Sequence, residues 1–346
     1  MSKFGRRTSG IALLTAVLLS FFCFFNSRQK QNNEHSISWI KRPYFEPIKI
    51  TQFYSNLPYV EIDIDGQLMP AKLDLGFDGE LCVPHQFMQA IHNKSFLHPV
   101  CYLGIRGKKY HSELYALPKI KIGRLNLFKT KAQLTSPEFE HDTILYTEDG
   151  VDGSPSPYDY SSGGTIGWKL FQHMNLFLDF NHAIAAFCDS LNTLILRGYP
   201  IESFSEAPLL INRNLIEFEA VTEEGPLRCV LDTGASYSYL NTYRCSTERI
   251  SPKEMDFQPR LNPNNADLMA ANQNDRIEFK SFECGQKEFG PILFRHLDTP
   301  LDIQAIIGMD FIASKLIFVD FANQKIYFSD APSCPKVNIQ LSKSNK

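Results

Sequence analysis

Two aspartates, Asp74 and Asp232, each follow an apolar run and stand two residues before a glycine, in the stretches "AKLDLGFDG" and "CVLDTGASYS". Two carboxylates held close together cannot both ionise, because the charge on one raises the proton affinity of the other. The charged member of such a pair can take a proton from a bridging water, which then attacks a peptide carbonyl. The protonated member can hydrogen-bond the carbonyl oxygen and later help to protonate the leaving nitrogen. The sequence therefore contains groups suited to acid–base hydrolysis of peptides, provided that the fold brings them together.

An internal repeat predicts that the fold does bring them together. Residues 59–84 align with residues 216–241, and each segment contains a Leu-Asp-x-Gly stretch. Residues 164–190 align with residues 305–331 without a gap, and both contain a glycine after apolar residues and a later Asp-Phe pair. Two copies related by a pseudo-two-fold axis would place the two aspartates opposite each other at the interface between the copies.

The elements that must position the aspartates are expected to be strands. Short alternating apolar runs broken by Gly, Asn, Asp and Pro fill the chain from about Pro47, and no sustained helical period appears. Residues 59–76 are typical of a β-hairpin with Asp65-Gly66 at its turn, and the second copy of the hairpin has Gly225 at its turn. Further strands are expected near residues 115–123, 175–180 and 183–189.

These motifs together resemble the signature of the aspartic protease family. The family has a catalytic Asp-Thr-Gly loop, which residues 232–234 match, and a hydrophobic-hydrophobic-Gly segment packed beneath it, which residues 306–308 match. Because both motifs have a second copy, the chain looks like two retropepsin-like lobes duplicated in one chain, as in the pepsin-type bilobal layout. The resemblance implies an all-β fold of two pseudo-two-fold-related β-barrel lobes, preceded by an N-terminal hydrophobic helix, with aspartic endopeptidase activity.

The resemblance also assigns roles to particular positions. The catalytic pair would be Asp74 and Asp232. The supporting residues would be Gly76, Thr233, Gly234, Ser236, Gly167 and Gly308. In the family a β-hairpin flap closes over the substrate, and residues 101–115 match its position. Its candidate substrate-binding residues are Tyr102, Gly104, Gly107 and Tyr110, and an ordinary surface hairpin is the alternative interpretation.

The same layout predicts how the chain is divided. A signal sequence or membrane anchor is expected at residues 1–30, a linker at 31–46, an N-terminal protease-like lobe at 47–200, a C-terminal lobe at 201–335 and a tail at 336–346.

The N-terminal segment predicts export. Lys3, Arg6 and Arg7 precede an apolar run over residues 11–25, an order typical of a signal sequence. No small-x-small cleavage site follows the run, which favours an uncleaved membrane anchor, with a cleaved signal as the alternative. The catalytic unit is therefore expected outside the cytoplasm, in the periplasm or the extracellular space, either anchored in the membrane or secreted.

The composition limits the classes of molecule that the protein is expected to bind. The net charge of −3 and the lack of a long basic block argue against nucleic acid. The 9 histidines are dispersed without ligand spacing, so no metal or other cofactor is expected. The expected partners are a peptide or protein substrate and a membrane, and the chain is expected to be a monomer. Cys82 and Cys101 could form a disulfide, with isolated buried thiols as the alternative.

Three positions depart from the family pattern. Leu75 stands where the family has a threonine, and in the family the two threonines hydrogen-bond across the interface. Thr233 must therefore find another partner or leave its hydroxyl half satisfied. Phe77 and Ala235, each three residues after an aspartate, carry no hydroxyl to stabilise the carboxylate, which predicts an activity optimum nearer neutral pH.

Two other functions remain open at this point. One is a catalytically weak or inactive protein that binds peptides or a partner in the cleft between the lobes. The other is an all-β envelope protein in which the Asp-x-Gly stretches are only turns.

Overall fold

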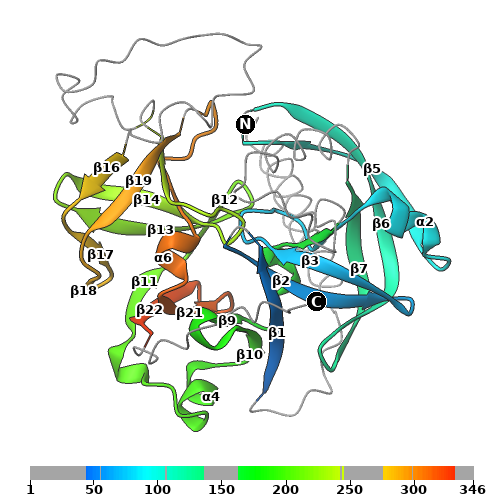
Figure 1. The fold of residues 1–346 in the computed structure, drawn as a ribbon, viewed down its shortest axis with the longest axis horizontal. Coiled ribbons are helices and arrows are strands. Elements are labelled where there is room, and N and C mark those ends of the chain that lie inside the picture. The colour runs from blue at the N-terminus through cyan, green and yellow to red at the C-terminus, as the bar shows by residue number, and fades with distance from the viewer. Residues whose placement is uncertain are drawn as a thin grey trace, which may run out of the picture. The chain divides into compact units, whose positions relative to one another are not determined.

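The computed structural model describes residues 44–54, 56–105, 107–135, 163–241, 244, 276–297 and 299–331. They belong to one compact unit, Pro43–Lys346. Strands dominate this unit and form a 13-stranded sheet and a 9-stranded sheet, with short helices beside them (Figure 1). The expectation of a mostly β body is confirmed.

The strands of the first half are β1 (Phe45–Tyr54), β2 (Leu57–Ile64), β3 (Gln67–Leu73), β4 (Leu81–Val83), β5 (Ser95–Leu103), β6 (Lys109–Ile122), β7 (Leu125–Leu134), β8 (Gly164–Ile166), β9 (Leu176–Asp179) and β10 (Ile184–Cys188). Those of the second half are β11 (Ser205–Pro208), β12 (Leu210–Asn212), β13 (Leu215–Thr222), β14 (Gly225–Leu231), β15 (Tyr239–Asn241), β16 (Arg276–Phe279), β17 (Phe282–Cys284), β18 (Lys287–Glu288), β19 (Ile292–Leu297), β20 (Ala305–Ile307), β21 (Lys315–Asp320) and β22 (Lys325–Asp330). The helices are α2 (His85–Ala90), α4 (Leu191–Leu196) and α6 (Met309–Ile312), with single 3-10 turns η2 (Trp168–Leu170), η3 (Phe180–His182) and η4 (Ile201–Ser203).

The predicted hairpin before Asp74 is confirmed. β2 and β3 pair antiparallel, with Ile62 opposite Met69, and both of these side chains are fully buried. The turn uses Asp65 and Gly66 with φ angles of 55° and 84°, left-handed values that an Asp-Gly turn adopts readily. β13 and β14 form the matching hairpin of the second half.

Strand pairing repeats in the two halves. In the first half β8 runs parallel to β3 and antiparallel to β4, and β4 runs parallel to β7. In the second half β20 runs parallel to β14 and antiparallel to β15, and β15 runs parallel to β19. The repeat in the sequence therefore corresponds to a repeat of strand pairing. It gives the loops that follow β3 and β14 equivalent surroundings.

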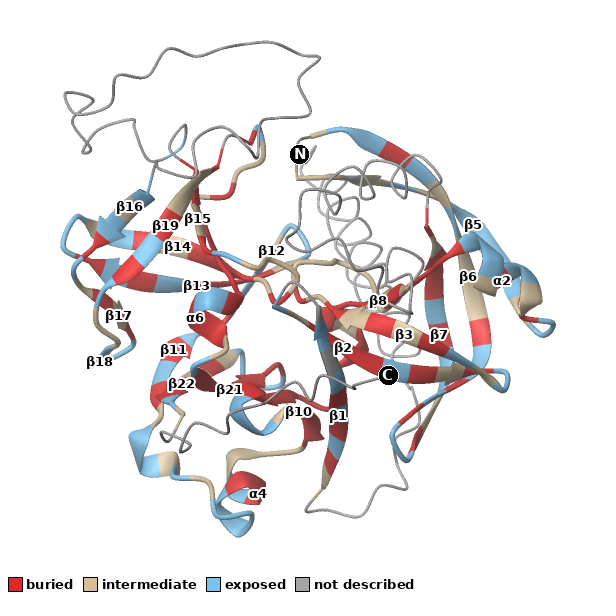
Figure 2. Ribbon diagram, viewed as in Figure 1, coloured by how far each residue is buried: buried red, intermediate tan, exposed pale blue. Residues whose placement is uncertain are grey.

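The two strands that end at the aspartate of the repeated Asp-Phe pair join the halves. β9 pairs antiparallel with β21, with Leu178 opposite Ile317, so the 13-stranded sheet contains strands from both halves. Every residue of β9 and of β21 is buried, as the red segments of Figure 2 indicate for β21. The core at this junction is rich in phenylalanine, including the fully buried Phe177, Phe187, Phe318 and Phe328.

The repeated aspartate of the Asp-Phe pair closes a turn. Asp179 Oδ1 accepts a hydrogen bond from the backbone N–H of His182 at 3.3 Å, and Asp320 Oδ1 accepts one from that of Asn323 at 3.0 Å. Each aspartate thus satisfies a backbone donor where the strand turns back, which explains its recurrence in the repeat.

The predicted signal sequence or membrane anchor, residues 1–30, and the predicted tail, residues 336–346, lie outside the described residues. Within the part of the chain that the structure describes, no helix is long and apolar enough to cross a membrane.

The disulfide considered between Cys82 and Cys101 is not formed. Cys82 is a buried thiol whose sulfur lies 3.2 Å from the hydroxyl of Thr135, whereas Cys101 is an exposed thiol on β5. Cys82 behaves as a small core residue that also contacts a polar neighbour.

Candidate active site

Two equivalent loops carry Asp74 and Asp232. The backbone N–H of Asp74 donates to the carbonyl of Ile166 at 2.9 Å, and that of Asp232 donates to the carbonyl of Ile307 at 3.0 Å. Each aspartate is therefore held at the end of its hairpin by the parallel strand beside it, β8 in the first half and β20 in the second. The hydrophobic-hydrophobic-Gly segments are the strands that provide these contacts.

The two carboxylates are brought together because each packs against the glycine of the other loop. A Cβ atom added at Gly76 would lie 2.5 Å from Cγ of Asp232, and one added at Gly234 would lie 2.3 Å from Cγ of Asp74. Atoms that are not bonded to each other do not approach so closely, so a side chain at either position would displace the opposite carboxylate. In addition, the N–H of Gly234 donates to Asp232 Oδ1 at 2.7 Å.

Two further glycines let the supporting segments pack beneath the loops. A Cβ atom at Gly167 would lie 2.3 Å from the carbonyl oxygen of Gly79, and one at Gly308 would lie 2.3 Å from that of Tyr237. Both carbonyls belong to the loops that carry the aspartates. A side chain at either glycine would push its loop away from the supporting strand.

Thr233 links the two loops from one side. Its hydroxyl accepts a hydrogen bond from the backbone N–H of Leu75 at 3.1 Å and donates one to the carbonyl of Leu73 at 2.7 Å. The hydroxyl is therefore fully used, although the residue opposite is a leucine, because its partners are backbone groups. Leu75 is fully buried and has no hydroxyl with which to make the reciprocal link.

A lysine that the motif analysis missed completes the site. Nζ of Lys72 lies 2.9 Å from Oδ2 of Asp74, and the two side chains are 26% and 16% exposed. Lys72 stands two residues before Asp74 on β3, and alternation along a strand puts both side chains on one face. The matching residue of the second half is Val230. This difference between the repeats is the signal that could have identified the lysine from the sequence.

The surroundings of the two aspartates differ in how they affect proton binding. Burial raises the pKa of Asp232 from its ordinary value of 3.8 to about 7. The charge on Asp74 and a hydrogen bond between the two carboxyl groups raise it as well, while the Lys72 ammonium and the Gly234 N–H lower it. Burial lowers the pKa of Lys72, but the Asp74 carboxylate outweighs this effect and leaves it above its ordinary value. The cluster therefore suits a shared proton near neutral pH.

The predicted flap is the hairpin of β5 and β6. Tyr102 pairs with Tyr110 across the strands, and their rings stack with centroids 5.3 Å apart. At the tip, the N–H of Gly104 donates to the carbonyl of Lys108 at 2.9 Å, and Gly107 has a φ of 75°. Tyr110 is buried, whereas Tyr102 is partly exposed.

The tip of this hairpin contacts the second half of the chain. The hydroxyl of Thr299 donates to the carbonyl of Ile105, and a Cβ atom at Gly107 would lie 2.6 Å from Cγ of Pro300. The side chain of Ile105 packs against an apolar cluster beside the Asp232 loop. The buried members of this cluster are Val230, Leu297, Ile303 and Ile306.

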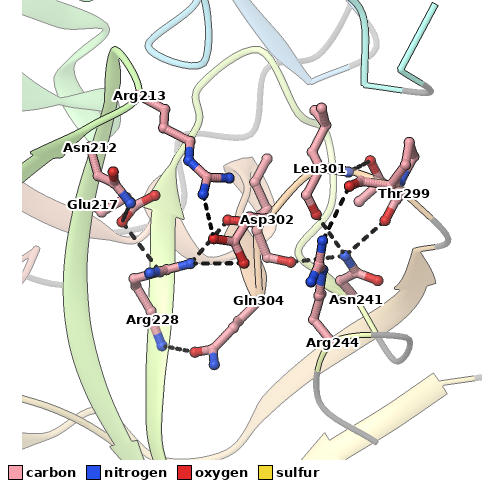
Figure 3. Close-up of polar contacts among 12 residues, drawn as sticks. Asn212, Arg213, Glu217, Arg228, Asn241, Arg244, Thr299, Leu301, Asp302 and Gln304 are labelled. Atoms are coloured by element: carbon pink, nitrogen blue, oxygen red, sulfur yellow. Dashed lines mark hydrogen bonds and ion pairs between the residues drawn. The ribbon is translucent and has the colours of Figure 1, made fainter. Parts of the chain in front are cut away.

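The segment that receives the flap tip is held in place by Asn241 at the end of β15 (Figure 3). Its side-chain nitrogen lies 3.2 Å from the carbonyl of Thr299, 3.4 Å from that of Leu301 and 2.9 Å from that of Ile303. One amide group thus binds three carbonyl groups of the same segment.

Charged groups fix the other end of the same segment (Figure 3). The backbone N–H of Arg228 donates to Oε1 of Gln304 at 2.8 Å, and its guanidinium donates to the carbonyl of Asp302 at 3.0 Å. The Asp302 carboxylate lies 2.9 Å from the guanidinium of Arg213. Glu217, whose pKa is raised by burial, lies 3.3 Å from Arg228. These contacts hold the segment that the tip of the β5–β6 hairpin touches.

The structure thus brings Asp74, Asp232, Gly76, Gly234 and Thr233 together. Ser236 lies in the turn that follows, with a partly buried side chain. Sequence reasoning missed Lys72, Asn241 and Thr299; the last two carried no recognisable signal, because their roles depend on the segment that they contact.

Comparison with protein-family models and with curated proteins finds no match for this chain.

Proposed function

We propose that the chain is an aspartic endopeptidase, built as two retropepsin-like lobes in the pepsin-type bilobal layout. It would hydrolyse the peptide bonds of a substrate with a water activated between the carboxyl groups of Asp74 and Asp232. The observation that carries the proposal is the reciprocal packing of each carboxylate on the glycine of the opposite loop. Aspartates that served only as turn residues would have no need of a glycine from the other half of the chain.

The chemistry follows from the shared proton. A water between the carboxyl groups gives a proton to the charged member and attacks the carbonyl carbon of the substrate. The protonated member hydrogen-bonds the carbonyl oxygen and then helps to protonate the leaving nitrogen. The raised pKa of Asp232, about 7, supports an activity optimum nearer neutral pH than an unperturbed pair would give. The cause is burial and the neighbouring Asp74, in addition to any effect of the missing hydroxyls at Phe77 and Ala235.

The flap hairpin would cover an extended peptide bound across the two loops. Because its tip contacts Thr299 and Pro300, it must move before a substrate can enter. We further propose that the N-terminal apolar segment anchors the chain, with the peptidase outside the cytoplasm.

Cleavage of an unstructured peptide pool tests this function. Wild type is expected to cleave, Asp74→Asn and Asp232→Asn are each expected to lose at least about 1,000-fold in rate, and a statine-type inhibitor should block the wild type. The matched control is Asp65→Asn, which makes the same change at an exposed turn residue and should retain wild-type activity. Equal cleavage by all four proteins would contradict the proposal.

One observation favours a second candidate, a peptide-binding protein with little or no turnover. Leu75 removes one of the two cross-loop hydroxyl contacts, and looser carboxylates would catalyse poorly. Binding of the statine-type peptide without cleavage of the pool would support this second function.

A further inference from the structure

The repeat makes Lys72 an anomaly. Lys72 lies opposite Thr165 in the β3–β8 pair, and Val230 lies opposite Ile306 in the equivalent β14–β20 pair. Val230 is buried in the apolar cluster that receives Ile105. The first half thus places an ammonium group where the second half places an aliphatic side chain. Burying most of a lysine is unfavourable unless a partner compensates for the lost hydration.

The partner is one member of the carboxylate pair. Nζ of Lys72 lies 2.9 Å from Oδ2 of Asp74, and three quarters of the lysine side chain is buried. Asp232 instead accepts the backbone N–H of Gly234. The ammonium therefore forms its ion pair with Asp74, whereas the hydrogen-bond partners of Asp232 are the neutral N–H of Gly234 and the carboxyl group of Asp74. The ammonium and two carboxyl groups that share one proton are together electrically neutral.

The other titratable groups that face the two aspartates carry no positive charge comparable to that of Lys72. Tyr59 on β2 lies near Lys72, and Tyr239 on β15 lies near Asp232. Burial raises the pKa of Tyr239, so it stays neutral around pH 7. Phenols ordinarily ionise near pH 10. Of the groups named here, Lys72 is therefore the one positive charge that can distinguish the two aspartates.

We infer that Lys72 is a positioning residue that keeps Asp74 as the ionised member of the pair and leaves the shared proton on Asp232. The consequence for turnover rests on the proposed peptidase function: Asp74 would be the base that activates water, and Asp232 the acid that hydrogen-bonds the carbonyl oxygen. The raised pKa of Asp232 agrees with this division of roles. Which of the two aspartates holds the proton is a property of the folded protein and does not depend on whether the protein cleaves peptides.

Titration of the aspartates tests the inference without requiring activity. The full-length protein, labelled with ¹³C at aspartate carboxyl groups, is titrated by NMR, and Asp74→Asn and Asp232→Asn assign the signals. Lys72→Met keeps the length of the side chain and removes the charge. It is expected to raise the pH at which the pair loses its shared proton by about one pH unit. Lys72→Arg keeps the charge and should titrate close to the wild type.

The control is Lys119→Met, which removes an exposed lysine on β6 away from the pair and should leave the titration unchanged. A wild-type titration in Lys72→Met, or an equal shift in Lys119→Met, would overturn the inference. If the protein cleaves peptides, the basic limb of the kcat profile should move with the titration, and kcat should fall several-fold with little change in KM. A shifted titration in a protein that cleaves nothing would keep the inference and reject the peptidase.

Discussion

Replacing Asp232 with asparagine is expected to stabilise the folded protein at pH 8 and to change its stability little at pH 4. Burial and the charge on Asp74 raise the pKa of Asp232 from 3.8 to about 7. Each pKa unit corresponds to about 1.4 kcal/mol, so the wild type loses up to about 4 kcal/mol when this carboxyl ionises in the fold. Because the side chain keeps partial access to solvent, we expect a gain of about 2–4 kcal/mol from Asp232→Asn.

The sign follows from proton linkage. A group whose pKa is raised on folding contributes stability that is fully present below its unfolded-state pKa, here 3.8, and is lost as the pH rises to about 7. Asparagine does not ionise, so the variant keeps this contribution. The difference in unfolding free energy between the variant and the wild type should therefore grow between pH 4 and pH 7 and then level off.

Urea-induced unfolding from pH 4 to pH 8, followed by circular dichroism and by the fluorescence of the buried Trp168, measures the difference. The control is Asp65→Asn, because Asp65 is exposed at a hairpin turn and asparagine suits the same backbone angles. Its difference from wild type should not vary with pH. A pH-independent difference for Asp232→Asn, or a variant less stable than wild type at pH 8, would refute the reasoning.

Three further changes test other parts of the site. Leu75→Thr would supply the missing hydroxyl and is expected to raise kcat/KM in the peptide-pool assay several-fold; an unchanged or lower value would mean that the missing contact does not limit catalysis. Gly234→Ala would place a Cβ atom 2.3 Å from Cγ of Asp74 and is expected to lower kcat at least about 100-fold, which activity within tenfold of wild type would contradict. Thr299→Val removes the hydroxyl that donates to Ile105, so amide hydrogen exchange at the flap tip should accelerate. Unchanged exchange would mean that this contact does not hold the flap.

Local signals made much of the fold predictable. The hairpin before Asp74 follows from alternating apolar residues and the Asp65-Gly66 turn, both of which act between near neighbours in the chain. The repeat also placed the supporting strands, because Ile166 and Ile307 occupy matching positions and hold the loops in the same way. The reciprocal packing of the aspartates on the opposite glycines has the symmetry that such a repeat predicts.

The hydrogen bonds of the Thr233 hydroxyl to the opposite loop could not be predicted from local sequence signals. Leu75 indicated that Thr233 would lose a partner, but the hydroxyl binds the N–H of Leu75 and the carbonyl of Leu73. Backbone groups are present at every residue, so the sequence cannot say which of them a distant side chain will reach. The disulfide considered for Cys82 failed for the same reason, since spacing along the chain does not determine distance in space.

The sequence by itself identified the residues to which we assign the proposed chemistry: two aspartates in matching loops, the glycines beside them and a hairpin proposed to act as a flap. Only the tertiary structure decided how those residues differ from one another. It paired Lys72 with Asp74, buried Asp232 enough to raise its pKa, and rested the flap tip on Thr299 and Pro300. The physical reason is that strand and turn patterns depend on near neighbours. Charge, burial and contact between the halves depend on groups that only the folded chain brings together.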